Sequence, residues 1–395
     1  MNTVTPNPIL GVFMHAIGAW FAATCYTPQK KVRGWSWQSY WITQASFCWF
    51  LLPILGAMFT IPDLWAVLRE APKDAMRNSF LLGMLYGIGG TAFGISIRYI
   101  GFSLTYAIAV GLSGVLGTLI PTFVNGVAGF FKTPGAHPFG DAVQAGVHAL
   151  GVTFSRTGGA WVLGGIVVGT IGIALTGMAG RMKEQDLSKQ NNVGDFALLK
   201  GLLLSLLAGV LSAVYGFSLS AGEPIADVAS AHGAGVWRGN VVYIFSNTGA
   251  FLTTSIYCLY LHFKHKTLGE LIELPAGTER ASLPMNFAMA VVTGVFWYGQ
   301  FFFYNLGHVR MGTFQFSSWG IHMIMLVLFS NIVGVALREW RGCRRVTHQA
   351  IATALLVLVA AVLSLTFGNK IAEDAAKEKP APEPPKNGEL PPGKN

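Results

Sequence analysis

The chain has 395 residues, of which 52% are hydrophobic and only 11% are charged, and its mean hydropathy is +0.49. Soluble domains carry about 25% charged residues, so this composition excludes a soluble globular protein and indicates an integral membrane protein. The net charge of +9 could indicate a nucleic-acid-binding protein, but the Lys and Arg residues lie in short links between apolar runs, as in membrane proteins. The cysteines have no paired spacing, which indicates neither a disulfide framework nor a metal site. They are Cys25, Cys48, Cys258 and Cys343.

Ten segments are long and apolar enough to cross a bilayer, which takes about 20 mostly apolar residues. Residues 1–8 contain no Lys or Arg, so we expect the first segment to be a retained helix rather than a cleavable signal peptide. The sequence therefore predicts an all-α integral membrane protein with ten transmembrane helices. The segments are 9–26, 41–60, 79–97, 101–124, 160–180, 199–220, 237–262, 284–306, 311–337 and 346–367.

Lys and Arg residues are divided unequally between the two sides of this predicted bundle. One set of links contains 14 of them and the opposite set contains 7, without the C-terminal tail and with Arg238 at the start of the segment 237–262 included. The side that is richer in Lys and Arg usually faces the cytoplasm. We therefore expect Lys30, Lys31, Arg33 and the stretch 338–345 in the cytoplasm, and the N-terminus outside.

Two stretches fall outside the pattern of spanning segments. The long link 125–159 contains FGDAVQAGVHALGVTF, which fits an amphipathic surface helix or a solvated loop about equally well. Residues 368–395 are rich in proline and charge and cannot bury a core, which predicts a disordered tail.

A weak internal repeat relates two halves of the chain. Residues 83–101 and 294–312 both run from glycine to glycine and end in a short basic turn, and the offset of 211 pairs Tyr86 with Trp297. Two five-helix halves would enter the membrane from opposite sides, an inverted repeat that is typical of secondary transporters. Chance similarity between glycine-rich apolar segments is the alternative. The predicted halves are 1–180, with the link 125–159, and 199–367.

Polar and aromatic side chains recur on one face of the predicted helix 284–306 and its continuation. Trp297, Gln300, Tyr304 and His308 are spaced at i, i+3, i+7 and i+11, which places them on one helical face. Such groups are costly in hydrocarbon unless they face a partner or a wet cavity. The pattern predicts a cavity that binds a polar solute.

The next predicted helix repeats the pattern with Gln315, Trp319 and His322 at i, i+4 and i+7. Aromatic rings suit the C–H face of a sugar, and amides and imidazoles can bond its hydroxyl groups. His15, in the first helix, could bond a sugar or carry a proton, although a core histidine is an equally good interpretation. The predicted substrate-binding residues are His15, Trp297, Gln300, Tyr304, Gln315, Trp319 and His322.

None of the 18 acidic residues lies deep in a predicted helix, so no midplane carboxylate is available to carry a coupling proton. The remaining candidates for proton coupling are His15, His322 and His308, with Glu223 at the margin. Glu223 and Asp227 would lie at i and i+4 of a helix, but a solvated link is favoured there. Sodium coupling through backbone carbonyls and hydroxyls of broken helices is the other possibility.

No enzymatic motif is present. The chain lacks GxSxG, HExxH and Walker sequences, and the spacing of His137 and Asp141 is one residue short of that in membrane acyltransferases. We therefore expect neither an enzyme nor a bound cofactor or metal.

Several longer motifs resemble the L-rhamnose–proton symporter family of the drug/metabolite transporter superfamily. They are MHAIGAW, CYTPQKKVRGWSW, GISIRYIGFSLTYAIAVGL, GEPIADVA, WYGQFFFYNLGH, SSWGIHM and IVGVALREW, which together extend from His15 to Trp340. The chain departs from the family pattern at Gly90–Phe93 and Phe314–Ser317.

This resemblance implies ten helices in two inverted halves, and uptake of L-rhamnose or a related 6-deoxyhexose with a proton across the bacterial inner membrane. No nucleic acid is expected as a partner. An exporter of another small metabolite on the same fold, sodium-coupled or uncoupled, is the alternative. A non-transporting membrane sensor is a third possibility, which the polar helical faces disfavour.

Overall fold

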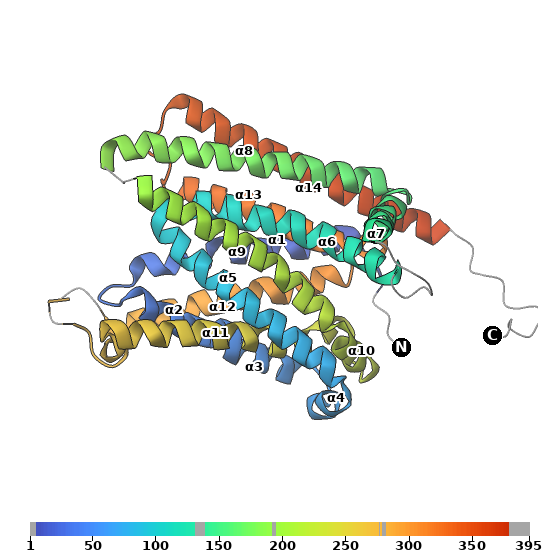
Figure 1. Cartoon of the computed structure of the whole chain (residues 1–395), viewed down its shortest axis with the longest axis horizontal. Helices are drawn as coiled ribbons and strands as arrows, with labels where there is room; N and C mark the ends of the chain where they lie inside the picture. Colours follow the sequence, from blue (N-terminus) through green and yellow to red (C-terminus); the bar gives the residue numbers. More distant parts are fainter. Residues whose placement is uncertain (1–4, 131–138, 192–194, 276, 279–281, 379–395) are drawn as a thin grey trace, which may run out of the picture.

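The structure is a computed structural model that describes residues 5–130, 139–191, 195–275, 277–278 and 282–378. Every regular element in these residues is a helix, so the prediction of an all-α protein is confirmed. The helices run side by side along the long axis of the molecule (Figure 1).

Within the described residues, nine helical stretches are long and apolar enough to span a membrane. Two of them include a π-helical segment, η2 (Ser46–Leu51) or η3 (Tyr106–Val110), because the chain adds a residue to one turn there. The nine stretches are built from α1 (Pro8–Thr24), α2 (Trp37–Ala45) with η2 and α3 (Leu52–Thr60), α5 (Lys73–Thr105), η3 with α6 (Gly111–Phe130), α8 (Gly159–Asn191), α9 (Asp195–Ala221), α12 (Leu283–His308), α13 (Ser317–Ala336) and α14 (Arg345–Glu378).

The predicted segment 237–262 corresponds to α11 (Val242–His265), which lies in the bundle beside α5 but is not among these nine. Its Ser, Thr and Asn residues lower its hydropathy. Some of them make buried contacts, since Thr254 pairs with Thr91 of α5 at 2.9 Å and Asn247 accepts a hydrogen bond from Tyr215 of α9 at 2.6 Å. The polar groups of α11 are therefore directed into the protein.

Several predicted boundaries needed correction. The turn between the third and fourth segments is centred on Gly101, whose φ of 73° and ψ of 175° break the helix, rather than on residues 98–100. The expected tail begins too early, because α14 continues past residue 367 to Glu378. Residues 379–395 lie outside the described residues.

Two shorter helices lie at one end of the bundle. α7 (Phe139–Phe154) occupies the predicted link 125–159, so the helical interpretation was right for that part of the link, while residues 131–138 lie outside the described residues. α10 (Glu223–Ala231) replaces the solvated link that was favoured around Glu223 and Asp227. These helices, with α4 (Leu64–Glu70), lie at the same end as the N-terminus (Figure 1).

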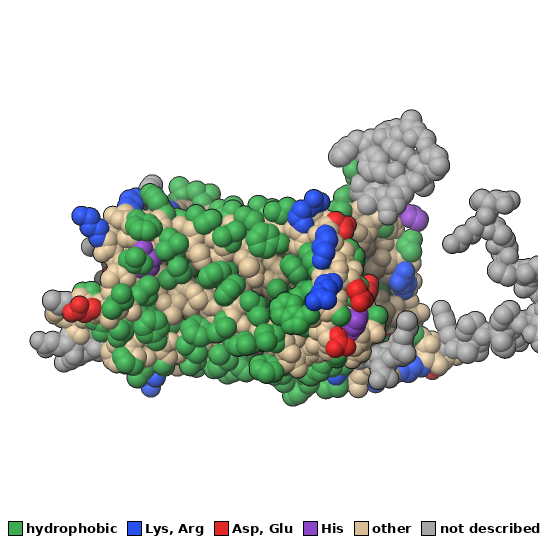
Figure 2. Space-filling model, turned by 90° about the horizontal axis from the view of Figure 1, so that it is seen from below, with side chains coloured by type: hydrophobic (Ala, Val, Ile, Leu, Met, Phe, Trp, Pro, Cys, Tyr) green, Lys and Arg blue, Asp and Glu red, His purple; other side chains and the backbone are tan. Residues whose placement is uncertain are grey.

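The surface of the bundle matches a bilayer. Figure 2 shows hydrophobic side chains over the middle of the molecule and charged side chains near its two ends. Large apolar residues such as Phe59, Leu356 and Leu363 are more than half exposed. In water such a surface would cause aggregation, whereas in lipid it is satisfied.

The helices approach one another closely where glycines face a neighbour. α5 packs most extensively against α9 and α11, and α8 packs along α14. A Cβ atom at Gly83 of α5 would lie 2.0 Å from the carbonyl oxygen of Ser246, and one at Gly249 of α11 would lie 2.1 Å from that of Phe80. Glycines therefore set the α5–α11 distance, as small residues do at many membrane helix interfaces.

We predict that Gly83→Ala lowers the stability of the protein by about 1–3 kcal/mol, because the new methyl group must displace backbone. The measurement is the melting temperature of purified protein in detergent. Gly177→Ala in α8 is the matched control, since a Cβ there meets nothing within 4 Å. Equal melting temperatures for the two variants would contradict the close α5–α11 packing.

Candidate transport pathway

A cavity with about 580 Å³ of empty space lies in the middle of the bundle. Segments from both predicted halves line it: α1, α5, η3 and α6 from the first half, and α9, α12 and α13 from the second. The lining residues are Ala22, Cys25, Tyr26, Tyr86, Gly90, Phe93, Tyr106, Val110, Ser113, Ser212, Trp297, Gln300, Phe301, Trp319, Met323 and Leu326.

The wall of this central cavity is largely aromatic. Trp297 packs on Phe301 with ring centroids 4.8 Å apart, and Tyr86 of α5 lies 6.3 Å from Trp297. Trp49, from the π-helical segment η2, contacts Trp297 edge to face at 5.2 Å. These contacts hold the indole of Trp297 in one orientation at the cavity wall.

A few polar groups interrupt the aromatic wall. The amide side chain of Gln300 lines the cavity, and the hydroxyl of Ser113 is buried there without a hydrogen-bond partner in the described residues. Trp319 donates its indole N–H to the Ser113 carbonyl at 3.0 Å. Buried polar groups are normally hydrogen-bonded, so Gln300 and Ser113 are available to a polar ligand.

A second cavity, with about 890 Å³ of empty space, continues from the central one toward the end that carries α10. Trp319 lines both cavities and separates them. This outer cavity is more polar than the central one. Its lining residues with polar side chains include Thr118, Thr122, Asn125, Ser220, Glu223, Tyr304, Asn305 and His308.

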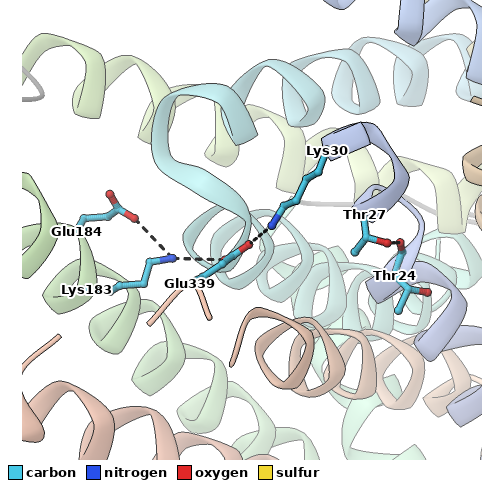
Figure 3. Close-up of polar contacts among 6 residues, drawn as sticks. All are labelled: Thr24, Thr27, Lys30, Lys183, Glu184 and Glu339. Carbon is cyan, nitrogen blue, oxygen red and sulfur yellow. Dashed lines mark hydrogen bonds and ion pairs between the residues drawn. The ribbon is translucent and has the colours of Figure 1, made fainter. Parts of the chain in front are cut away.

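Ion pairs bridge the opposite end, which we interpret as the closed end of the pathway. A small pocket of about 250 Å³ continues from the central cavity beyond Tyr106, which lines both, and reaches Glu339. Glu339 forms ion pairs with Lys30 at 3.0 Å and with Lys183 at 3.6 Å, and Lys183 also lies 3.8 Å from Glu184 (Figure 3). Lys30 follows α1, Lys183 lies on α8 and Glu339 follows α13. The ion pairs therefore connect three helices at this end of the bundle.

Three histidines cluster beside the cavities. His15 of α1 and His322 of α13 are fully buried, with ring centroids 5.8 Å apart. Tyr304 of α12 contacts both rings, at 5.2 and 5.4 Å, and stacks on His308 at 5.6 Å. The ring nitrogens of His15 and His322 have no hydrogen-bond partner within the described residues. His15 and His322 lie behind Tyr304, since neither of them lines the central or the outer cavity.

The structure places most of the sequence-predicted site residues around one pathway. Trp297 and Gln300 line the central cavity, Tyr304 and His308 line the outer cavity, and Trp319 lines both. Glu223 also lines the outer cavity, where it forms an ion pair with Arg238 at 3.1 Å.

Gln315 is the exception. α13 begins only at Ser317, and Gln315 lies in the turn that follows η6 (Gly312–Phe314), where its backbone N–H donates to the Gly312 carbonyl at 3.1 Å. The helix that was expected to include Gln315 therefore begins two residues after it. Gln315 lines neither the central nor the outer cavity.

Several lining residues were not predicted as site residues: Tyr86, Phe93, Tyr106, Ser113 and Ser212. A signal for Tyr86 was present, because the internal repeat pairs it with Trp297 and both line the central cavity. The repeat likewise pairs Gly90 with Phe301, which both line it. Tyr106 and Ser113 follow the turn at Gly101, where the sequence shows no polar face.

A multi-span helical bundle with an interior aromatic cavity, open toward one end and closed toward the other, has the architecture of a membrane transporter. Comparison with known proteins agrees. The L-rhamnose-proton symport protein (RhaT) family matches residues 4–140 and 139–369, and the chain belongs to this family. It is therefore a multi-pass membrane transporter and not an enzyme.

The chain is similar to curated bacterial proteins over nearly its whole length. It is 31% identical over 360 residues to the L-rhamnose-proton symporter of Cronobacter sakazakii, which covers 90% of this chain and 97% of that protein. It is 30% identical to the symporter of Klebsiella pneumoniae over the same shares. Identity to that of Shigella dysenteriae is 29%, over 91% of this chain and 98% of the relative. No solved structure matches the chain.

The open and closed ends can be distinguished by labelling in detergent. In a Cys343→Ser background, we expect Ser220→Cys, in the outer cavity, to react with a water-soluble maleimide at least about tenfold faster than Ser330→Cys, in the small pocket. The other native cysteines are buried and contribute little reaction. Similar rates at the two positions would contradict the closed end.

Proposed function

We propose that this protein imports a monosaccharide, L-rhamnose or a related 6-deoxyhexose, by proton symport with alternating access. The observation that carries the proposal is the central cavity, which Trp297, Trp319 and the amide side chain of Gln300 line together. The names of these relatives supply the sugar and the coupling ion. At about 30% identity these names support a sugar–proton symporter more strongly than they support one particular sugar.

The cavity chemistry supports a sugar as substrate. A pyranose has apolar C–H faces and a rim of hydroxyl groups. In the proposed site, the sugar stacks on Trp297, and Gln300 bonds its hydroxyls, with Trp319 closing the side toward the outer cavity. A buried amide that bonds a hydroxyl discriminates strongly against analogues that lack it, because the amide is then left unpaired.

Tyr304 lies on the path by which the sugar would reach this site. Its ring lines the outer cavity and contacts Trp319 at 5.7 Å. We assign it to substrate binding during entry. His15 and His322 lie behind it and bond no sugar in this arrangement, although both were expected to bind substrate.

The helix packing supports ten spans in two inverted halves. If α5 corresponds to α12 and α1 to α9, a two-fold relation requires that the α5–α9 contact be matched by an α12–α1 contact. Both contacts are extensive. The contact of α1 with α13 is likewise matched by the contact of α9 with η3 and α6. The helices α8 and α14, which correspond to each other, pack directly together.

This relation makes α11 the counterpart of the broken helix α2–η2–α3 and therefore the tenth span. The two pack against each other, as related elements on a two-fold axis do. With 24 residues, α11 is about 36 Å long, which is sufficient to cross the hydrocarbon core.

The charge distribution assigns the two ends to the two sides of the membrane. The ends of α1, α8 and α13 that carry Lys30, Lys183 and Glu339 belong to the side that is richer in Lys and Arg, which we place in the cytoplasm. The outer cavity then faces the outside of the bacterial inner membrane. This arrangement is an outward-open state in which the ion pairs of Glu339 close the cytoplasmic end.

The experiment that tests the function is uptake of labelled L-rhamnose by cells that express the chain, with and without a protonophore. We expect accumulation that the protonophore abolishes. Gln300→Ala should reduce the rate at subsaturating sugar by about 10- to 100-fold, because it leaves a substrate hydroxyl unpaired.

Thr91→Val is the matched control for Gln300→Ala, because Thr91 is buried but pairs with Thr254 and lines neither cavity. It should retain uptake. Full transport by Gln300→Ala at normal expression would remove Gln300 from the site. No uptake by the wild-type protein, verified in the membrane, would reject L-rhamnose and lead to a screen of other sugars with protons and sodium.

A further prediction concerns the closed end. Glu339→Gln removes both ion pairs of that residue, and we expect Ser330→Cys to react about tenfold faster in this background, equivalent to a loss of about 1.4 kcal/mol of closure free energy. The measurement is the maleimide labelling rate in inside-out vesicles. Asp186→Asn is the control, because its partner Arg344 ties α8 to the start of α14 and does not close the pathway. An equal increase in both variants would argue against Glu339 as the closing residue.

A further inference from the structure

The pair formed by His15 and His322 is unusual for a buried site. Four ring nitrogens without a partner in the described residues lie together inside a membrane-spanning bundle. Buried imidazoles are normally held by a carbonyl, a carboxylate or a hydroxyl, since an unpaired polar group is costly away from water. Nothing in the packing of the sugar cavity explains the pair, because neither ring lines that cavity.

The helices that surround the pair are shaped to hold imidazole rings. A Cβ atom at Gly18 of α1 would lie 3.0 Å from Cε1 of His322 and 2.7 Å from the Gln300 carbonyl oxygen. A Cβ atom at Gly307 of α12 would lie 2.9 Å from both Cε1 and Nε2 of His15. Larger residues at either glycine would displace the rings, so these two glycines make the space that the pair occupies.

A row of titratable side chains leads from the pair to water. Tyr304 contacts both rings and stacks on His308, which lines the outer cavity. The groups that face the pair from the elements packed around it are therefore Tyr304 and His308 of α12, with one histidine each on α1 and α13. Glu223 lies further out, where Arg238 holds it at the cavity wall.

We infer that His15 and His322 together bind the coupling proton, and that His308 and Tyr304 connect this site to the outer cavity. The inference rests on the proposed function, proton-coupled sugar import, and names its proton site. A proton from water in the outer cavity forms an N–H bond on one imidazole, and the unprotonated nitrogen of the neighbouring ring accepts a hydrogen bond from it. A second proton would place two positive charges side by side, so the pair binds one.

The position of the pair explains how the proton could affect the sugar. Gln300 and Tyr304 lie one turn apart on α12, so the cavity amide and the residue that contacts the pair are on the same helical face. Gly18 of α1 touches both the Gln300 backbone and His322. A charge on the pair therefore acts where α1, α12 and α13 meet, which is also where these helices border the sugar cavity.

The test uses purified protein in proteoliposomes and compares the wild type with His15→Gln and His322→Gln. Two transport readouts are needed: equilibrium exchange of labelled L-rhamnose, which needs no net proton movement, and accumulation driven by an imposed pH gradient. We expect each variant to keep exchange within about threefold and to lose at least about tenfold in accumulation, together with the sugar-induced alkalinisation of the medium. His265→Gln, at an exposed histidine at the opposite end of the bundle, should change neither readout.

Accumulation equal to that of the wild type in either variant would overturn the inference. Loss of exchange together with accumulation, in protein that remains monodisperse, would also overturn it, because the histidines would then serve the sugar. If the buried substitutions prevent folding, His308→Gln takes their place. This half-buried residue at the cavity wall should slow gradient-driven uptake while leaving exchange unchanged, and unaffected uptake would refute the proton path.

A measurement without sugar separates this inference from the proposed function. Between about pH 5 and 8, where imidazoles usually titrate, purified wild-type protein should bind about one proton more than the double variant His15→Gln, His322→Gln. If the wild type failed to transport L-rhamnose, the substrate would be wrong, and the proton count alone would decide the proton site. Equal counts would reject it.

Discussion

A polar side chain in a membrane-spanning helix must find a partner or a wet cavity, and the interior of this protein is arranged around that constraint. The outer face of the bundle is apolar, as Figure 2 shows, so polar groups of the spanning helices point inward. Some are paired there, such as Tyr40 with Thr293 at 2.5 Å. Among the buried polar groups without a hydrogen-bond partner in the described residues, His15 and His322 lie where α1, α12 and α13 meet, close to the cavity-lining Gln300. A bound solute and a bound proton would supply the hydrogen bonds that these side chains lack.

A transport pathway must be closed at one end at a time. In this bundle, aromatic rings narrow the interior and ion pairs bridge one end. Aromatic rings narrow the interior at Trp319 and Tyr106, where neighbouring cavities share a wall. At the closed end, charges on flexible side chains bridge three elements, with Lys30 about half exposed and Lys183 nearly buried. Exposed ion pairs contribute only about 0–1 kcal/mol, and burial of a partner adds a desolvation cost that offsets the attraction. Such contacts can hold a two-state protein in one state without preventing the other.

The sequence was sufficient for the parts of the fold that follow from local pattern. Apolar length located the spans, and helical spacing placed Trp297, Gln300, Tyr304 and His308 on one face of α12, where the structure puts cavity walls. Prediction from the sequence failed for the segments that connect the helices and for contacts between residues that are distant in the chain. Gln315 was assigned to a helix that begins two residues later, and α10 was taken for a loop because its charges suit solvent. Glu339 was overlooked because its role depends on Lys30 and Lys183, which are distant in sequence.

The two proposed halves line the cavity with different chemistry, and this difference bears on the proposed substrate. The cavity-lining residues of α5, namely Tyr86, Gly90 and Phe93, include no amide or imidazole, whereas their counterparts on α12 lie beside Gln300. Gly90 cannot be enlarged without meeting Trp49, whose ring would lie 2.9 Å from a new Cβ. The proposed sugar would therefore direct its hydroxyls toward α12 and an apolar face toward α5. A 6-deoxyhexose suits such a site because it carries a methyl group in place of the hydroxymethyl group of a hexose, and a methyl group against Gly90 and Phe93 leaves no hydroxyl unpaired.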